Sequence, residues 1–175
     1  MIEASLLRHA LVDSPIGSLR IVASGHGITG IYMEGHTPPP SPEALGVRLP
    51  TVEEDPHLAH CARELAEYFA GSRRAFEVEL DASGTDFQKR VWEQLSSIPF
   101  GQSRSYGALA LALGDAKLTR AVGTANGRNP ISIIVPCHRV IGADGSLTGY
   151  AGGLAAKLFL LRLEGLEPAA EATLF

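Results

Sequence analysis

The chain has 175 residues, 45% hydrophobic and 19% charged, a composition typical of a folded globular protein. No stretch reaches the roughly 18 to 20 consecutive apolar residues of a membrane span, and the N-terminus lacks the features of a secretory leader, so we expect a cytoplasmic protein. The net charge of −4, taken alone, argues against a nucleic-acid partner. With only two cysteines, Cys61 and Cys137, we expect free thiols and no disulfide framework.

The charge is unevenly distributed along the chain. Residues 1–84 carry 6 basic and 12 acidic side chains, whereas residues 85–175 carry 9 and 7. Residues 103–139 contain one acid, Asp115, and five basic residues, which are Arg104, Lys117, Arg120, Arg128 and Arg139. A basic face of this kind suits a phosphate backbone, but it also occurs on ordinary solvated surfaces. Charge alone leaves both interpretations open.

The first half of the chain has the pattern of a small α/β domain, which we place at residues 1–84. Alternating apolar residues over 5–33, interrupted by Ser-Pro-Ile-Gly and Gly-His-Gly turns, predict two or three strands in an antiparallel sheet. A proline-rich loop follows near residues 37–42, and residues 55–71 then predict an amphipathic helix. Residues 75–80 predict a short strand.

From Thr85 the pattern becomes helical, and we expect a second, mostly helical domain at residues 85–175. Thr85 is a suitable N-cap for a helix that ends before Pro99. Two more helices are predicted, one from about Tyr106 and one to about Asn126, joined by a tight turn that contains glycine. This is the pattern of a helix-turn-helix, although helix pairs that merely pack together share it.

The second of these helices is rich in small residues and carries Arg120 near its start. Small side chains allow a helix backbone to approach another surface closely, whether a nucleic-acid groove or a neighbouring helix. A further amphipathic helix is predicted close to the C-terminus, ending at Gly165 with Pro168 just beyond it.

A cysteine and a histidine stand side by side in the sequence "IVPCHRVIG". The preceding run, residues 131–135, is apolar and β-branched, which predicts a short buried extended segment. Burial raises the pKa of a thiol, so Cys137 is either inert core filling or a nucleophile that is served by a base. His138 is the candidate base. Neighbouring residues of an extended chain point to opposite faces, so either the chain turns sharply here or a water joins the two side chains.

A catalytic base also needs a group that orients it. Glu164 is a candidate because it lies in the last turn of the C-terminal helix, where the helix dipole disfavours a carboxylate. Exposed glutamates at helix ends are nevertheless common. Cys137, His138 and Glu164 are thus a candidate nucleophile, base and orienting group.

Four short motifs carry a resemblance to a known family: "PCHRV" around Cys137, "NP" from eight residues earlier, "SYGALA" upstream and "TGYAGG" downstream. Together they resemble the O6-alkylguanine-DNA alkyltransferases, also called methylated-DNA–protein-cysteine methyltransferases. The resemblance is close over residues 86–165, and the first half matches in arrangement only. It implies a ribonuclease-H-like α/β N-terminal domain, followed by a mostly α C-terminal domain with a winged helix-turn-helix.

The resemblance also implies an activity, which is DNA repair by a suicide transferase. Cys137 would irreversibly take a methyl or larger alkyl group from O6-alkylguanine, and from O4-alkylthymine, in a single turnover. His138 would act as its base through a bridging water, held by Glu164. The implied partner is double-stranded DNA carrying O6-alkylguanine, and the protein would be a monomer that needs no cofactor.

Further roles carry over position by position from the family motifs. Asn129 matches a hinge asparagine that ties the recognition helix to the cysteine segment. Arg120 matches an arginine finger that fills the gap left in the duplex, and Tyr106 a tyrosine that helps to rotate the nucleotide out. The backbone around Val140 and the side chain of Tyr150 would line the pocket for the flipped base.

The sequence departs from the family pattern in two places. Some relatives bind a structural zinc in the N-terminal domain, but here His57, His60 and Cys61 have helical spacing typical of surface residues, so we expect no metal. Ala151 stands where some relatives have a serine that hydrogen-bonds the lesion oxygen, and this bears on how tightly lesions are discriminated.

Two other functions fit parts of the same pattern. A Cys–His hydrolase would use the same pair of side chains, but we find no oxyanion-hole motif and such an enzyme needs no helix-turn-helix. A DNA module that binds lesions without chemistry would need the helix-turn-helix but not the thiol of Cys137.

Overall fold

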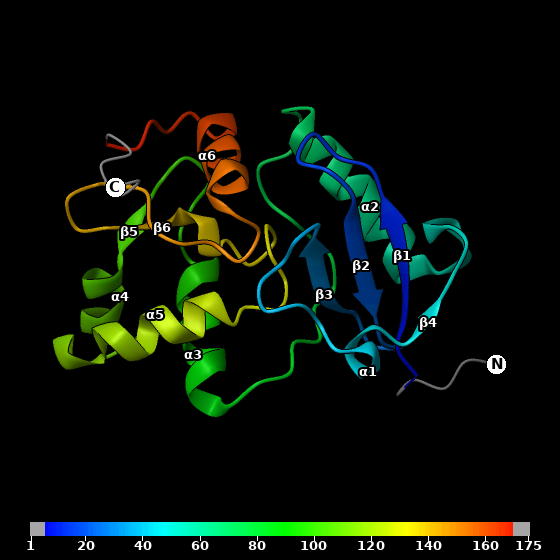
Figure 1. Ribbon diagram of the computed structural model, residues 1–175, viewed down its shortest axis with the longest axis horizontal. Coiled ribbons are helices and arrows are strands. Elements are labelled where there is room, and N and C mark those ends of the chain that lie inside the picture. Colours follow the sequence, from blue (N-terminus) through cyan, green and yellow to red (C-terminus); the bar gives the residue numbers. More distant parts are fainter. Residues whose placement is uncertain (1–5, 170–175) are drawn as a thin grey trace. The chain divides into compact units, whose positions relative to one another are not determined.

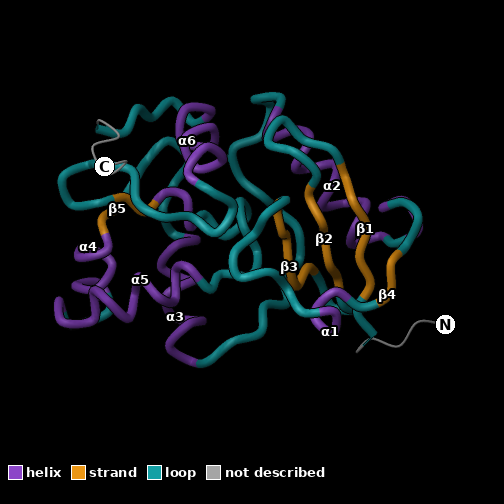
Figure 2. The backbone as a smooth tube through the Cα atoms, in the orientation of Figure 1, coloured by secondary structure: helices purple, strands orange, loops and turns teal. Residues whose placement is uncertain are grey.

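The computed structural model describes residues 6–169, and the chain separates into two compact units, Met1–Ser83 and Gly84–Phe175. The first unit combines a sheet with helices, and the second is mostly helical (Figures 1 and 2). Over the described residues, no helix has the length and apolar character needed to cross a membrane.

The first unit is built on a four-stranded sheet with the order β3-β2-β1-β4. The predicted antiparallel strands are confirmed as β1 (Arg8–Val12), β2 (Leu19–Ala23) and β3 (Ile28–Met33). A short fourth strand, β4 (Val47–Arg48), pairs parallel with β1 and was not expected from the sequence. It follows the proline-rich loop and the single-turn helix α1 (Pro42–Leu45).

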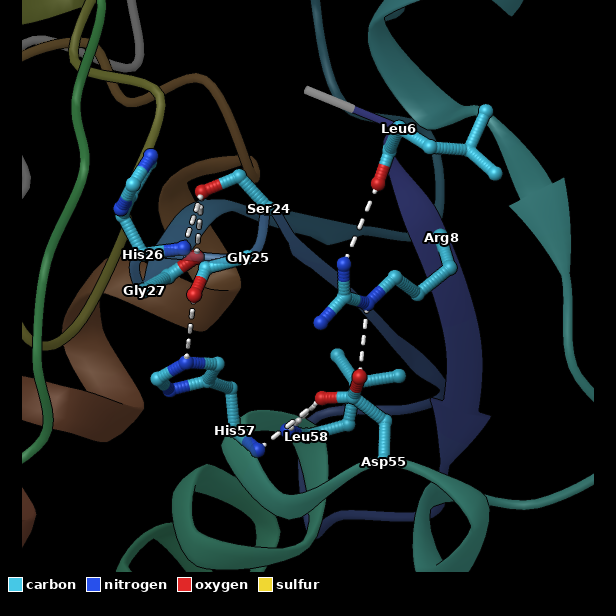
Figure 3. A network of polar contacts seen from close by, with 9 residues as sticks. All are labelled: Leu6, Arg8, Ser24, Gly25, His26, Gly27, Asp55, His57 and Leu58. Atoms are coloured by element: carbon cyan, nitrogen blue, oxygen red, sulfur yellow. Dashed lines mark hydrogen bonds and ion pairs between the residues drawn. The ribbon is translucent and has the colours of Figure 1, made fainter. Parts of the chain in front are cut away.

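Helix α2 (Pro56–Phe69) packs on this sheet and confirms the predicted amphipathic helix. Its N-cap is Asp55, whose Oδ1 accepts hydrogen bonds from the backbone N–H groups of His57 and Leu58 (Figure 3). The other carboxylate oxygen accepts from Arg8 Nε at 2.6 Å, in an ion pair that is largely buried. One carboxylate therefore fixes the start of α2 to strand β1. The buried residues of the helix are Leu58, Cys61, Glu64, Leu65 and Tyr68.

The prediction of a strand over residues 75–80 is wrong. Among the described residues, the segment meets the sheet in one isolated bridge between Leu80 and Ile28. Earlier in the segment, the backbone N–H of Glu77 donates to the Glu64 side chain at 2.7 Å instead of to a neighbouring strand. The alternation of apolar and acidic residues misled because a loop can bury alternate side chains as a strand does. One of these side chains is Phe76, whose ring centroid lies 5.4 Å from that of Tyr68.

The second unit begins with helix α3 (Asp86–Ser96), which starts at a capping box formed by Thr85 and Gln88, as the sequence predicts for Thr85. The indole N–H of Trp92 donates to the backbone oxygen of Ala125 at 2.9 Å. This buried hydrogen bond ties α3 to the helix that carries Arg120.

The predicted helix-turn-helix is confirmed. It consists of α4 (Tyr106–Ala112), the 3₁₀ turn η2 (Ala116–Leu118) and α5 (Thr119–Gly127). A two-stranded parallel sheet of β5 (Arg104–Ser105) and β6 (Val140–Ile141) accompanies it. The expected fold class, an α/β unit followed by a mostly α unit with a winged helix-turn-helix, is therefore confirmed.

Candidate active site

The segment before Cys137 is a buried tight turn, so the predicted extended conformation of residues 131–135 is wrong. The backbone N–H of Val135 donates to the carbonyl oxygen of Ile131 at 3.0 Å, which closes the turn. Ile133 within it has a φ of 75°, a conformation that β-branched residues rarely adopt. An apolar run that is buried on all sides has the same composition in a turn as in a strand, and this is why the pattern misled.

Asn129 holds the turn together at both ends. Its Nδ2 donates to the carbonyl oxygen of Val135 at 2.8 Å, and its Oδ1 accepts from the backbone N–H of Ile131 at 3.0 Å. The side chain is buried, so both hydrogen bonds are shielded from water. Asn129 also lies just beyond the end of α5, and it thereby connects that helix to the cysteine segment.

The chain turns sharply at the cysteine. Pro136 has φ −82° and ψ 66°, and the N–H of Cys137 donates to the oxygen of Val135 at 2.8 Å, which is an inverse γ-turn. Cys137 then opens the 3₁₀ helix η3 (Cys137–Arg139). Of the two alternatives left by the sequence, the structure has the turn, but none of its described hydrogen bonds joins the Cys137 thiol to the His138 ring.

The Cys137 thiol is recessed and protonated in its resting state. Only 4% of the residue is exposed, and burial raises the pKa of the thiol. A hydrogen bond with the Asn129 side chain and the positive charge of Lys157 act in the opposite direction. Cys137 and Cys61 are both free thiols. The pKa of Cys61 is raised to about 12, chiefly by burial and secondarily by the Glu64 carboxylate, so its thiol is inert.

His138 is completely buried and contacts Glu164. Its Nε2 lies 2.7 Å from Glu164 Oε2. Burial lowers the pKa of the imidazole, while the Glu164 carboxylate opposes this shift, so the ring is neutral at pH 7. A neutral ring whose Nε2–H donates to the carboxylate presents Nδ1 as a hydrogen-bond acceptor. Nδ1 has no partner among the described protein atoms, and it is therefore available to receive a proton.

Glu164 lies at the C-cap of α6 (Leu154–Leu163) and is buried, unlike an ordinary exposed glutamate at a helix end. Its Oε1 accepts from Arg139 Nε at 2.8 Å and from the Gly101 N–H at 3.1 Å, and its Oε2 accepts from Arg139 Nη2 at 3.0 Å. The guanidinium of Arg139 thus pairs with both oxygens of the carboxylate. Arg139, counted above with the basic surface, is in fact buried and paired, and that part of the prediction is wrong.

Lys157 is a site residue that the sequence reasoning missed. It is completely buried, and its Nζ donates to the carbonyl oxygen of Val140 at 2.6 Å. It also donates to Thr148, at 3.2 Å to the carbonyl oxygen and at 3.1 Å to Oγ1. Burial lowers its pKa to about 8, and the negative charge that Cys137 carries as a thiolate opposes that shift. The spacing of Lys157 with the buried Leu160 and Leu161 was the available signal, because it puts a lysine on the apolar face of the helix.

Three further residues expected at the site are Tyr106, for rotation of the nucleotide, and Val140 and Tyr150, for the pocket. Tyr106 places its Oη 2.7 Å from Thr148 Oγ1, and burial raises the pKa of the phenol. Val140 is buried, its carbonyl oxygen accepts from Lys157, and its N–H donates to the carbonyl oxygen of Cys137. Tyr150 is half-buried in the loop that follows Thr148.

Helix α5 presents an exposed face of small and basic side chains. Arg120 and Arg128 are exposed near its two ends. Exposed between them are Ala121, Thr124 and Gly127. A Cβ added at Gly123 would lie 3.8 Å from the Tyr106 ring, so the two helices approach closely at this point. The small residues thus serve packing against α4 as well as an open outer surface.

The potential metal ligands of the first unit have other partners. His57 Nε2 lies 3.3 Å from the carbonyl oxygen of Gly25, and His60 Nε2 lies 2.8 Å from Glu64 Oε2 (Figure 3 for His57). Within residues 6–169, no group of three or more His, Cys, Asp and Glu side chains is arranged to hold a metal ion.

Comparison with known families identifies the class of protein that this fold and site define. Residues 86–166 match the family model described as 6-O-methylguanine DNA methyltransferase, DNA binding domain. Residues 7–82 match the model described as 6-O-methylguanine DNA methyltransferase, ribonuclease-like domain. The chain belongs to the 6-O-methylguanine DNA methyltransferase family.

Individual relatives are similar over nearly the whole chain. The methylated-DNA–protein-cysteine methyltransferase of Methanosarcina acetivorans is 46% identical over 158 residues, covering 90% of this chain and 97% of the relative. The Mycobacterium tuberculosis protein of the same name is 46% identical over 170 residues, covering 97% and 99%. The crystal structure of Mycobacterium tuberculosis OGT in complex with DNA matches with a TM-score of 0.82 and 46% identity, covering 93% of this chain and 96% of that one. The likeness thus extends further into the first half than its sequence motifs indicate.

Proposed function

We propose that this protein repairs alkylated duplex DNA by irreversibly transferring the alkyl group of O6-alkylguanine to the sulfur of Cys137. The observation that carries the proposal is the recessed Cys137 thiol next to the buried His138–Glu164 pair, in a unit that also holds the helix-turn-helix. Family membership and the relatives named for this reaction support it.

The chemistry requires a proton acceptor for the thiol. A water bridges Cys137 Sγ and His138 Nδ1, passing the thiol proton to the imidazole, and Glu164 stabilises the imidazolium that forms. The thiolate then attacks the alkyl carbon in line, a carbon–sulfur bond forms and the carbon–oxygen bond breaks. The electron pair leaves with the guanine O6, and the base takes up a proton as it returns to guanine. The product is a stable thioether, so each protein acts once and no cofactor is needed.

The recessed thiol also explains why the target base must leave the helix. Guanine O6 lies inside a stacked pair, and a thiol that is only 4% exposed cannot reach it there. The small-residue face of α5 enters the minor groove, and the exposed Arg120 fills the gap that the base leaves. Tyr106 assists the rotation, and Asn129 holds the cysteine segment against the end of α5.

The flipped base lies against Tyr150 and the backbone around Val140. Binding through the DNA backbone needs no base sequence, only a lesion that enters the pocket, and the modest basic surface agrees with this. We further propose that O4-alkylthymine is a second substrate, and that the protein works as a monomer in the cytoplasm.

Intact-mass spectrometry tests the proposal after incubation with a duplex carrying one O6-methylguanine. We expect each protein to gain the mass of one methyl group, and peptide mapping to place it on Cys137. Cys137→Ala should gain nothing, whereas the matched variant Cys61→Ala should react like the wild type because the Cys61 thiol is inert. Repeated turnover without a mass gain would contradict the proposal. Binding of the lesion without transfer would indicate a recognition module, and turnover of a thioester would indicate a hydrolase.

A further inference from the structure

Thr148 bridges two ionisable side chains of the site. Its hydroxyl oxygen lies 3.1 Å from Lys157 Nζ and 2.7 Å from Tyr106 Oη. Lys157 comes from helix α6, Tyr106 is the first residue of α4, and Thr148 lies in the loop before Tyr150. The start of α4, which lies 42 residues before Thr148, therefore meets the nearby helix α6 at one hydroxyl group.

Hydrogen-bond counting gives this bridge a direction. A lysine ammonium has three donors and no acceptor. Lys157 Nζ has four acceptors, Val140 O at 2.6 Å, Thr148 Oγ1 at 3.1 Å, Thr148 O at 3.2 Å and Gly149 O at 3.5 Å. The ammonium is therefore fully satisfied, and Thr148 Oγ1, the second shortest contact, accepts one of its protons. Among the described hydrogen bonds of Thr148 Oγ1, the one with Tyr106 Oη is the only one that can take the Thr148 hydroxyl proton. With Thr148 donating there, the proton of the Tyr106 phenol is left to donate elsewhere.

The direction reverses when Lys157 loses its proton. A neutral amine accepts a hydrogen bond, so the Thr148 hydroxyl can donate to Nζ and accept from Tyr106. The phenol proton is then occupied by Thr148, and Tyr106 can only accept hydrogen bonds from a bound molecule. Burial lowers the Lys157 pKa to about 8, so both charge states are accessible close to neutral pH.

We infer that Thr148 is a positioning residue that transmits the charge state of Lys157 to Tyr106, and thereby sets whether the phenol donates or accepts a hydrogen bond toward the base bound beside Cys137. This inference rests on the proposed function for the identity of the bound base. The link between the three side chains rests only on their geometry.

Other charged and titratable groups face Lys157, but none of those below links its charge state to the Tyr106 phenol. From η3, Cys137 raises the pKa of Lys157, and Lys157 in turn lowers the pKa of His138. The positive charge of Arg139 is balanced by the Glu164 carboxylate, with which it forms a bidentate pair. Thr148 hydrogen-bonds both Lys157 and Tyr106 directly, so the route between these two side chains needs none of the other groups.

The first test measures the rate constant of methyl transfer to Cys137 in single turnover, from about pH 6.5 to about pH 9.5, a range that brackets the Lys157 pKa of about 8. We expect the wild-type rate to carry a descending component near that pKa. Thr148→Val keeps the shape and the carbonyl oxygen but removes the hydroxyl, so it should be about tenfold slower at pH 7 and lose that component. Thr148→Ser should retain the wild-type profile. A Thr148→Val protein with the wild-type rate and profile would overturn the inference.

A double-mutant cycle separates this route from a general packing defect. If Thr148 acts through Tyr106, then Thr148→Val should slow Tyr106→Phe no further, because the phenol it orients is already gone. Additive losses would show that Thr148 acts by another route. Thermal unfolding of each variant provides the check that the fold is kept.

A second readout does not depend on alkyl transfer. The Cζ resonance of Tyr106, labelled with carbon-13 and assigned with Tyr106→Phe, should shift as Lys157 titrates in the wild type and in Thr148→Ser, but not in Thr148→Val. If the wild type transfers no methyl group yet the resonance shifts, the proposed function fails and the coupling stands. If the resonance does not shift as Lys157 titrates, yet the methyl group is transferred, the proposed coupling through Thr148 is wrong and the proposed function stands.

Discussion

His138 and Glu164 are joined through Nε2 and Oε2 at 2.7 Å, and neither side chain has any exposed surface. The contact fixes which ring nitrogen carries the proton, and it leaves Nδ1 free to accept one. A protonated, recessed thiol needs such an acceptor, because the pKa of Cys137 is raised by burial. The pair is therefore the part of the site on which reactivity at neutral pH depends most.

Replacing His138 tests that dependence. In His138→Gln, we expect the rate constant of methyl transfer at pH 7 to fall by about 100-fold or more, because the thiol loses its base. The residual rate should rise steadily with pH, since hydroxide must then form the thiolate. Single-turnover measurements across the pH range provide both quantities. His57→Gln, a change in the first unit, is the control and should leave the rate unchanged; a similar loss there would point to a general effect on folding.

Replacing Glu164 tests its second role as the counter-charge of Arg139. Glu164→Gln keeps the shape but leaves a buried guanidinium without its partner, which should lower the free energy of unfolding by about 3–5 kcal/mol. Glu167→Gln is the matched control, because Glu167 pairs with Arg162 at the surface, with 67% and 56% of the two side chains exposed. That change should cost less than about 1 kcal/mol. Urea unfolding measures both, and equal costs would contradict the structural role given to Glu164.

The helices could be predicted from the sequence because local signals define them. Thr85 forms the expected capping box, and the helix-turn-helix follows its glycine-containing turn. The turn over residues 131–135 could not be predicted, because it depends on the side chain of Asn129 closing both ends and on a positive φ at Ile133. These are long-range constraints on an apolar run that looks like a strand.

The site shows the same division. A cysteine, a histidine and a glutamate could be selected by chemistry, and the structure confirms that His138 contacts Glu164. Two members of the site could not be selected in this way, since the sequence does not separate Arg139 from the other basic residues nearby, and Lys157 lies outside the four family motifs. Charged residues are usually exposed, so burial of a lysine or arginine is evident only once its partners are placed.

The buried Lys157 should make the free energy of unfolding depend on pH. Its pKa is lowered from 10.5 to about 8 on folding, so between these values the unfolded chain holds a proton that the folded protein has lost. The free energy of unfolding should therefore rise with pH across this window, by about 3 kcal/mol relative to Lys157→Met, which lacks the group. Taking the difference between the two proteins removes the contributions of the thiols and the phenols, which titrate in the same pH range. Parallel curves would contradict the lowered pKa, and Lys89→Met, at an exposed position, is the control with no expected change in slope.

Arg120 provides the test of the proposed extrusion of the base. Only a duplex requires a side chain to fill the gap, so Arg120→Ala should slow repair of duplex DNA by at least about tenfold, yet leave the reaction with free O6-methylguanine unchanged. Lys117→Ala is the matched control, because it removes the same charge from another exposed position of the helix-turn-helix. If Lys117 contacts a phosphate, its loss should reduce the slope of log K for DNA binding against log salt concentration by about 1. The rate at saturating duplex should stay unaltered. Single-turnover rates on both substrates, at saturating protein, distinguish insertion of the Arg120 side chain into the duplex from electrostatic attraction of DNA. Equal losses on duplex and free base for Arg120→Ala would show that the arginine does not enter the helix and acts instead on the site itself.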